Sequence, residues 1–242
     1  MNESLKNYRL YAAKASGGTS PPTVRSLVLK MIHEYNLNGS VLDYGAGKGE
    51  LLQKFHQEGR FTKLSGTDLF ERPTELPKPI DWYSQDLNEE INLKNEQYDV
   101  VVCTEVIEHL ENPRLVFRNI HRLLRNQGTL ILTMPNQESI RSFAGLLLGG
   151  HFASFLEFHY PAHITALLRL DLSRICSETG FEKPTFYYTN DGGLPKMTSV
   201  KWQTISFGLL RGRLFSDYLG MFTRKQTPSQ NSHLDGIQDS EC

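Results

Sequence analysis

Two carboxylates and an imidazole lie close together near the middle of the chain. Glu105, Glu108 and His109 form the pattern ExxEH directly after an apolar run at residues 98–103. Positions i, i+3 and i+4 of a helix share one face, so we expect these three side chains to converge. Two carboxylates at that separation repel each other unless a positive group lies between them. The pattern therefore indicates cation binding or general acid–base catalysis.

A divalent cation would relieve this repulsion. Oxygen ligands combined with imidazole suit Mg²⁺, Mn²⁺ or Zn²⁺, and His163 or His159 is available further along the chain as another ligand. In the alternative without a metal, these side chains pair locally or act as a general base. In both cases we expect Glu105, Glu108, His109 and His163 in the catalytic site; the competing interpretation of the two later histidines is an ordinary loop position.

A glycine-rich turn at residues 43–49 lies upstream, between a predicted strand at 41–44 and a helix that begins near Leu51. Glycine lets the backbone bend tightly and approach a ligand without a Cβ in the way, and the helix N-terminus offers free N–H groups. Asp68 ends the next predicted strand about twenty residues on, where a carboxylate can accept hydrogen bonds from both ribose hydroxyls. This order of elements predicts a nucleotide site; the alternative is a tight turn with a solvated aspartate.

The spacing of the glycines narrows the choice of nucleotide. Dinucleotide sites use GxGxxG, and the third glycine of that pattern would fall on Glu50. The chain instead has GxGxG, with Asp43 in front of it. This disfavours a dehydrogenase, and it resembles the first motif of class I S-adenosylmethionine-dependent methyltransferases. In that family the acidic residue orders the loop around the methionine end of the cofactor.

Later segments agree with this family in the same order. Gln85-Asp86-Leu87 resembles the segment whose aspartate meets the adenine amino group, 98–103 resembles the fourth strand, and 128–135 the fifth. The resemblance covers about residues 20–135 and extends more loosely to 181–224. It implies S-adenosylmethionine as the cofactor. The cofactor-binding residues that it implies are Asp43, Gly45, Ala46, Gly47, Gly49, Asp68, Leu69, Asp86, Leu87 and Thr104.

The ExxEH element resembles that of two methyltransferase groups, the ubiquinone-biosynthesis O-methyltransferases and the small-RNA 3′-end 2′-O-methyltransferases. Both resemblances imply a metal that holds adjacent acceptor oxygens, with Glu105, Glu108, His109 and His163 as its ligands here. Methyl transfer from a sulfonium is an in-line displacement, for which a neutral hydroxyl is a poor nucleophile. A bound cation lowers the pKa of the hydroxyl and fixes its position. In members of this superfamily without a metal, the resemblance implies that Glu105 borders the cofactor, that Glu108 caps or pairs locally, and that His109 is a general base or faces the acceptor.

Strands alternate with helices along most of the chain, which predicts right-handed crossovers and a mostly parallel sheet. Helices are expected at 21–35, after residue 50, near 116–124 and at 167–179, and two final paired strands at 181–189 and 215–222. Together with the resemblance, this gives an α/β class: a Rossmann-like, seven-stranded, mostly parallel sheet with an antiparallel last strand and helices on both faces.

The 242 residues suffice for one sizeable domain. We expect a mobile N-terminal arm at 1–20, which would either fold over the cofactor or remain disordered, a methyltransferase domain at 21–225 and a disordered tail at 226–242. The apolar segments 139–165 and 191–214 are expected to form a lid or acceptor pocket, or else to pack on each other and close the core.

The overall composition limits the partners. A net charge of −1 gives no global field that would attract nucleic acid. The three cysteines are far apart and suit a reducing cytoplasm, and we find neither a signal peptide nor the roughly 20 apolar residues of a membrane-spanning helix. The mixture of apolar, aromatic and basic residues in 191–214 resembles that of interfacial helices, so peripheral membrane contact is a hypothesis beside the packing of these segments on each other.

The sequence thus predicts O-methylation of a small hydroxylated molecule: a quinone precursor, a polyphenol or a saccharide, with a lipid-linked acceptor as one form of it. The competing functions are 2′-O-methylation of an RNA end, which the basic residues near 201–213 would serve, and a non-catalytic nucleotide-binding module.

Overall fold

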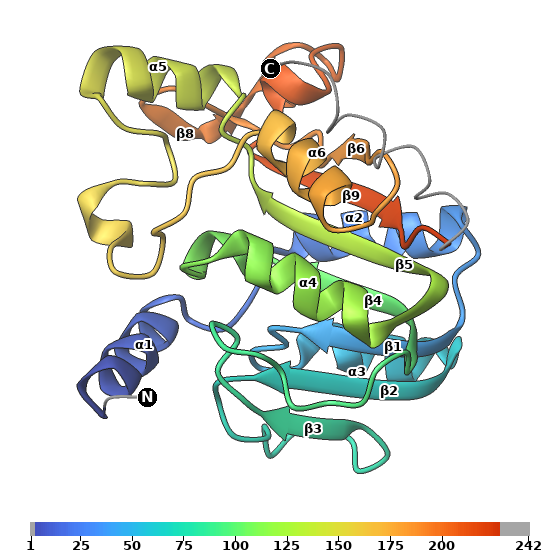
Figure 1. Ribbon diagram of the computed structural model, residues 1–242. Helices are drawn as coiled ribbons and strands as arrows, with labels where there is room; N and C mark the ends of the chain where they lie inside the picture. Colours follow the sequence, from blue (N-terminus) through green and yellow to red (C-terminus); the bar gives the residue numbers. More distant parts are fainter. Residues whose placement is uncertain (1–2, 228–242) are drawn as a thin grey trace, which may run out of the picture.

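A seven-stranded sheet with the strand order β3-β2-β1-β4-β5-β9-β6 forms the centre of this computed structural model, which describes residues 3–227 (Figure 1). The first five strands in this order are parallel, and β9 is antiparallel to both of its neighbours. The predicted mostly parallel sheet with an antiparallel last strand is therefore confirmed. The strands are β1 (Gly39–Tyr44), β2 (Phe61–Asp68), β3 (Asp81–Ser84), β4 (Tyr98–Thr104), β5 (Leu124–Pro135), β6 (Thr185–Tyr188) and β9 (Tyr218–Arg224), with β7 (Gly193–Leu194) and β8 (Met197–Lys201) in a separate hairpin.

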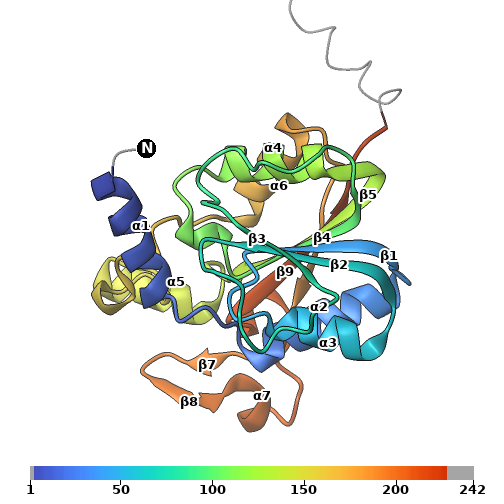
Figure 2. The same ribbon diagram turned by 90° about the horizontal axis from the view of Figure 1, so that it is seen from below.

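Helices cover both faces of the sheet (Figure 2). One apolar cluster includes side chains of α2 and α3, and a second cluster across the sheet includes side chains of α4 and α6. Because both faces are covered, β4 and the second half of β5 are almost entirely buried, as their nearly continuous apolar sequence predicts. The helices are α1 (Glu3–Ala15), α2 (Pro22–Glu34), α3 (Glu50–Glu58), α4 (Pro113–Leu123), α5 (Ile140–Gly149), α6 (Arg169–Glu178) and α7 (Trp202–Ile205).

Helix α4 shows how local sequence sets these layers. The side chain of Asn112 caps the helix by accepting a hydrogen bond from the Leu115 N–H at 3.1 Å, and Pro113 follows in the first turn. Val116, Ile120 and other apolar residues at helical spacing are buried against the sheet. The helix therefore begins directly after the ExxEH segment and leaves that segment at the edge of the sheet.

The ExxEH segment is not the regular helix that its spacing predicted. It contains only the 3₁₀ helix η1 (Ile107–His109), and Glu105 precedes it with a positive φ of 54°. The Glu105 N–H donates to the carbonyl and hydroxyl oxygens of Thr133 on β5, at 3.1 and 3.2 Å. These bonds hold Glu105 against the sheet and turn the chain before a helix can begin.

The two last strands also differ from their predicted bounds. The strand predicted at 181–189 begins only at Thr185, because Pro184 has no N–H to donate to a neighbouring strand. The strand predicted at 215–222 is displaced to Tyr218–Arg224, since the 3₁₀ helix η3 (Arg213–Phe215) occupies its expected start.

The predicted N-terminal arm at 1–20 contains helix α1, which lies beyond the carboxyl ends of the parallel strands, on the same side as α5 (Figures 1 and 2). Most of the predicted tail at 226–242 lies outside the described residues. Within the described part of the chain, we find no helix with the length and apolar character needed to cross a bilayer.

The turn between β1 and α3 packs directly against residues just before α2. Gly47 has a φ of +51°, and a Cβ built on it would lie 2.3 Å from the Gly18 carbonyl oxygen. That same carbonyl accepts a hydrogen bond from the Lys48 N–H at 2.9 Å. The close approach therefore requires glycine at position 47, and it holds the turn to the segment that leads into α2.

We predict that Gly47→Ala destabilises the fold more than Gly59→Ala does. Both positions have a positive φ, so each substitution costs roughly 1–2 kcal/mol of backbone strain, but a Cβ at Gly59 meets no atom within 4 Å. The steric overlap at Gly47 adds about 1–3 kcal/mol. Urea denaturation measures the free energy of unfolding of each variant. Equal losses of unfolding free energy in the two variants would contradict the close approach of Gly47 to the Gly18 carbonyl.

Candidate active site

A cavity of about 400 Å³ opens at the carboxyl ends of the parallel strands. Its walls come from α1, the turn after β1, the ends of β2 and β4, the η1 segment and the chain after α5. In an open parallel sheet, ligands bind in the crevice at this edge. Nine of the ten predicted cofactor residues line the cavity: Asp43, Gly45, Ala46, Gly47, Asp68, Leu69, Asp86, Leu87 and Thr104.

Gly49, the tenth predicted cofactor residue, is absent from the cavity lining and acts on the backbone instead. It is the N-cap of α3 with a φ of +74°, and a Cβ there would lie 2.7 Å from Leu76 Cδ1. Its N–H donates to the Ala46 carbonyl at 2.8 Å, which closes the turn. Gly49 therefore shapes the loop that the other glycines present to the cavity.

Asp68 connects the end of β2 to the glycine turn. Its Oδ2 accepts a hydrogen bond from the Gly47 N–H at 2.7 Å, and its Oδ1 accepts one from the Phe70 N–H at 3.1 Å. Burial raises the pKa of Asp68, and these backbone donors act in the opposite direction. Because a carboxylate has about four lone-pair positions, Asp68 can accept further hydrogen bonds from a ligand in the cavity.

Asp43 is a second buried acid in the cavity wall, with 2 % of its surface exposed. Burial, together with the nearby Asp68 carboxylate, raises the pKa of Asp43 to about 7. A positive group of a ligand would favour its ionised form. The site is thus suited to a cationic ligand.

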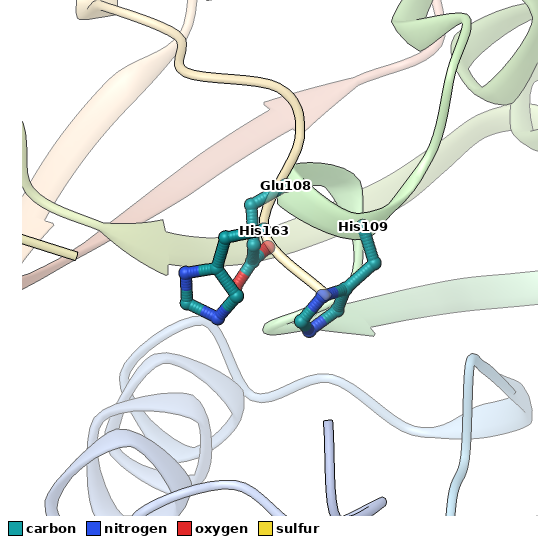
Figure 3. A group of neighbouring side chains, drawn as sticks. All are labelled: Glu108, His109 and His163. Carbon is teal, nitrogen blue, oxygen red and sulfur yellow. The ribbon is translucent and has the colours of Figure 1, made fainter. Parts of the chain in front are cut away.

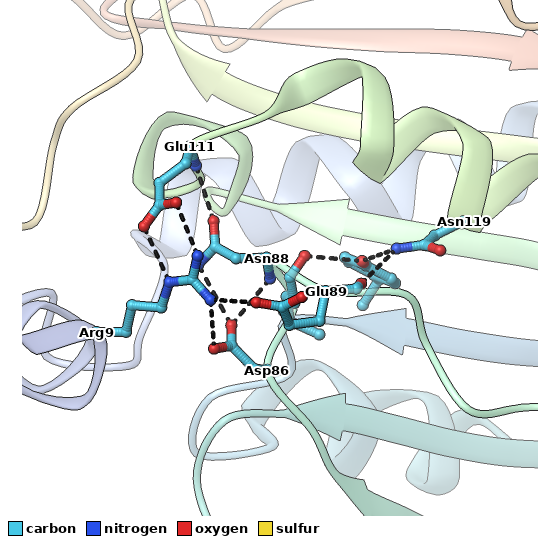
Figure 4. Close-up of polar contacts among 8 residues, drawn as sticks. Arg9, Asp86, Asn88, Glu89, Glu111 and Asn119 are labelled. Carbon is cyan, nitrogen blue, oxygen red and sulfur yellow. Dashed lines mark hydrogen bonds and ion pairs between the residues drawn. The ribbon is translucent and has the colours of Figure 1, made fainter. Parts of the chain in front are cut away.

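Arg9 of α1 binds three carboxylates from two segments of the domain (Figure 4). Its Nη1 lies 2.9 Å from Asp86 Oδ2 and 2.7 Å from Glu89 Oε1, while Nε and Nη2 bind Glu111 at 2.9 and 2.8 Å. Sequence analysis does not identify this role, because an arginine on a polar helix carries no motif. Asp86, which the resemblance assigns to the adenine amino group, thus forms an ion pair with Arg9 of α1.

Glu105 and Glu108 are the acids of the site with the fewest hydrogen-bond partners in the described residues. Glu108 is 1 % exposed, and within the described residues neither of its carboxylate oxygens has a hydrogen-bond partner; the same is true of Glu105 Oε1. Burial raises the pKa of Glu108 to about 8. Burial and the neighbouring Glu108 raise the pKa of Glu105 well above its usual value.

Glu108, His109 and His163 point toward a common space (Figure 3). Each offers one ligand atom, and these atoms lie within 4.8 Å of one another. Of the predicted ligands, Glu105 lies outside this group, and His159 is not part of it either. The chain after α5 brings His163 here, because the N–H groups of Ile164 and Thr165 donate to the Glu108 carbonyl at 2.9 and 3.0 Å.

Backbone carbonyls fix the orientation of both imidazoles. His109 Nδ1 lies 2.8 Å from the Ala162 carbonyl oxygen, and His163 Nδ1 lies 2.6 Å from that of Ser154. A carbonyl only accepts, so each Nδ1 carries a proton and donates it to that carbonyl. Burial lowers the pKa of both histidines, that of His163 to about 4, which keeps both rings neutral. Two neutral imidazoles and a carboxylate are a suitable ligand set for a divalent cation.

Arg141 and Tyr218 also line the cavity, and sequence analysis identified neither. Tyr218 reaches the site because β9 pairs with β5 in a register that places Tyr218 opposite Pro135. Arg141 lies in the first turn of α5 and contacts Asp217. Both positions depend on contacts between distant parts of the chain.

The sequence matches a known family and several curated proteins. Residues 19–184 match the family described as "Methyltransferase domain". The chain is 28% identical over 120 residues to a ubiquinone biosynthesis O-methyltransferase of Erwinia tasmaniensis, a match that covers 46% of this chain and 48% of that protein. It is 28% identical over 124 residues to the protein of the same name from Haemophilus ducreyi, with coverages of 46% and 51%. The chain spans about half the length of the curated relatives it matches.

Solved structures share the fold. A SAM-dependent methyltransferase from Archaeoglobus fulgidus superposes with a TM-score of 0.57 at 20% identity, covering 83% of this chain and 94% of that one. The 1,6-didemethyltoxoflavin-N1-methyltransferase of Burkholderia thailandensis, solved with 1,6-didemethyltoxoflavin and S-adenosylhomocysteine, gives 0.57 at 14% identity, with coverages of 85% and 79%.

We predict a pH-dependent stability difference between the wild type and Asp43→Asn in the absence of ligands. Burial raises the folded-state pKa of Asp43 to about 7, above the roughly 4 of an unfolded aspartate. The stability that protonated Asp43 contributes to the folded state is therefore complete at acid pH and is lost as the pH rises toward 7. The free energy of unfolding of the wild type minus that of the variant should fall by up to about 1.4 kcal/mol per pH unit.

Urea denaturation at several pH values between roughly 4 and 8 measures this difference. Asp81→Asn is the control, because the Asp81 side chain is 50% exposed and does not line the cavity. A difference that stays constant or grows with pH for Asp43→Asn would refute the prediction.

Proposed function

Because this chain belongs to the class I methyltransferases that use S-adenosylmethionine, we propose that it transfers the methyl group to a hydroxyl oxygen of a small acceptor. The bound cofactor supplies an electrophilic methyl group on a positively charged sulfur. Asp68 would accept hydrogen bonds from the ribose hydroxyls, and Gly45 and Gly47 would let the backbone approach the cofactor. Asp43 would face the positively charged methionine end, where its ionised form is favoured.

Metal assistance at Glu108, His109 and His163 is part of this proposal. The observation that carries it is a buried carboxylate without hydrogen-bond partners in the described residues, beside two imidazoles that each offer one ligand atom and whose Nδ1 atoms lie against backbone carbonyls. These donors fit Mg²⁺, Mn²⁺ or Zn²⁺. Bound there, a divalent cation supplies a Lewis acid that lowers the pKa of an acceptor hydroxyl.

The acceptor class follows from this ligand group. Three protein ligands leave coordination positions for two adjacent oxygens, as in a catechol or a vicinal diol. The curated relatives carry the name ubiquinone biosynthesis O-methyltransferase, and this supports a quinone precursor or another polyphenol over a saccharide. Without a metal, His109 would act as the general base, and a single hydroxyl would suffice.

The charges around the site disfavour an RNA acceptor. Of the basic residues near 201–213, Lys201 pairs with Asp191 at 3.0 Å and Arg213 with Glu138 at 3.6 Å. Phosphate binding requires clustered arginine and lysine side chains that are available to the ligand. These pairs therefore support a small-molecule acceptor.

The two apolar segments, 139–165 and 191–214, are inserts that support a lipid-linked acceptor reaching the site from a membrane surface. Leu147 and Leu148 on α5 are 85% and 76% exposed, and Phe207 and Leu209 after α7 are 95% and 84% exposed. Phe158, which is 77% exposed, lies in the segment that carries His163 into the site. Such side chains beside an exposed basic residue, here Arg211, are typical of interfacial segments.

We predict that the purified chain methylates 3,4-dihydroxytoluene with labelled S-adenosylmethionine, and that it methylates 4-hydroxytoluene much more slowly.

Thorough chelation should abolish turnover, and Mg²⁺, Mn²⁺ or Zn²⁺ should restore it. His163→Ala should lower activity at least about tenfold, whereas His33→Ala, on an exposed part of α2, should not. Unchanged activity after chelation would remove the metal from the mechanism, and labelling of neither phenol would contradict the proposed acceptor class.

For the membrane contact, we predict co-sedimentation with vesicles that contain anionic lipid. Each exposed leucine that enters the bilayer contributes roughly 1.5–3 kcal/mol, so Leu147→Ser with Leu148→Ser should weaken binding about tenfold or more. Leu170→Ser on α6 serves as the control, because Leu170 is 57% exposed and lies outside both inserts. Failure of the wild type to bind would exclude delivery from the membrane.

A further inference from the structure

Arg141 is one of the residues that line the cavity, as are His159 and Tyr218. The other arginine of the cavity, Arg9, already binds three carboxylates. Arg141 makes one ion pair, in which its Nη1 lies 2.9 Å from Asp217 Oδ2. Among the described residues, its Nε and Nη2 have no hydrogen-bond partner, so two donors remain available for a ligand.

The ion pair with Asp217 also fixes the position of this guanidinium. Asp217 Oδ2 accepts a second hydrogen bond from the Gly193 N–H at 3.0 Å, and the Asp217 carbonyl accepts one from the Asn136 N–H at 2.8 Å. The side chains of Arg141 and Asp217 are 26% and 14% exposed, so the pair is largely shielded from solvent. A guanidinium held in this way loses little conformational entropy when it binds a planar anion.

The positive charge of Arg141 acts on two other residues of the cavity, Tyr218 and His159. Burial raises the pKa of Tyr218, Glu105 and Glu108 raise it further, and Arg141 acts in the opposite direction, so Tyr218 lies within the field of all three. Burial, His163 and Arg141 lower the pKa of His159, which keeps this neighbouring ring neutral. The His159 ring in turn stacks on the His163 ring, with the ring centroids 5.2 Å apart. Arg141 therefore lines the same cavity as the residues that we expect to face the acceptor hydroxyls.

We propose that Arg141 binds a carboxylate substituent of the acceptor while the acceptor hydroxyls face Glu108, His109 and His163. This inference rests on the proposed function and narrows its substrate class to aromatic acids that carry adjacent hydroxyls. The guanidinium fork matches the two oxygens of a carboxylate, and such charge-assisted hydrogen bonds are about twice as strong as neutral ones. Tyr218, whose hydroxyl lacks a hydrogen-bond partner in the described residues, lies beside this anion subsite.

The test compares two ligands that differ in one substituent, 3,4-dihydroxybenzoate and 3,4-dihydroxytoluene. Calorimetry on the full chain saturated with S-adenosylhomocysteine should show that the wild type binds the benzoate about tenfold more tightly. Arg141→Met should bind both ligands equally, and Arg141→Lys should keep part of the preference because lysine retains the charge.

Arg169→Met is the matched control. Arg169 forms a similar ion pair with Glu138 at 2.6 Å and is 28% exposed, but it is not among the residues of the cavity wall. This variant should keep the full preference for the benzoate. The melting temperature and the affinity for S-adenosylhomocysteine of each variant show whether it is folded, and Arg141→Lys provides the comparison if Arg141→Met does not fold.

The outcomes separate this inference from the proposed function. Benzoate binding that depends on Arg141, without any methyl transfer, would support the anion subsite and contradict the proposed function. Methylation of 3,4-dihydroxytoluene by a wild type that shows no preference for the benzoate would support the function and overturn the subsite. The inference is also overturned if neither ligand binds or if Arg141→Met keeps the preference.

Discussion

The burial of several carboxyl groups is the constraint on which this site depends. Four acids, Asp43, Asp68, Glu105 and Glu108, lie at the carboxyl ends of the central strands, and each is at least partly withdrawn from solvent. Asp68 has backbone donors at 2.7 and 3.1 Å, whereas Glu108 has no partner within residues 3–227. Burial favours the neutral form of a carboxyl group unless positive charge is near. A cationic methyl donor beside Asp43 and a metal beside Glu108 would supply that charge in two places.

The fold provides the rest of the site by bringing distant segments to one edge of the sheet. Parallel pairing aligns the ends of β1, β2 and β4, and the antiparallel β9 places Tyr218 beside the end of β5. Helix α1 lies across this edge, where Arg9 binds Asp86 and Glu111 (Figure 4). Tyr8 on the same helix donates a hydrogen bond to the Tyr160 hydroxyl at 2.9 Å, which joins α1 to the segment that carries His163.

Local parts of this arrangement could be predicted from the sequence, and long-range parts could not. The glycine turn and Asp68 follow from the order of strand, turn, helix and strand. The convergence of Glu105, Glu108 and His109 was inferred from helical spacing, but the hydrogen bonds to Thr133 prevent a regular helix, and Glu105 lies outside the ligand group. Arg9 and Arg141 could not be identified, because their partners lie 77 to 102 and 76 residues away.

Isothermal titration of S-adenosylmethionine into the purified, folded chain tests the central claim most directly. The account predicts saturable binding at a single site, strongly weakened by Asp68→Ala, which removes the acceptor for the ribose hydroxyls and the partner of the Gly47 N–H. Asp81→Ala, at an exposed position on β3, should bind like the wild type. Absence of binding by well-folded wild-type protein, or equal binding by Asp68→Ala, would contradict the account.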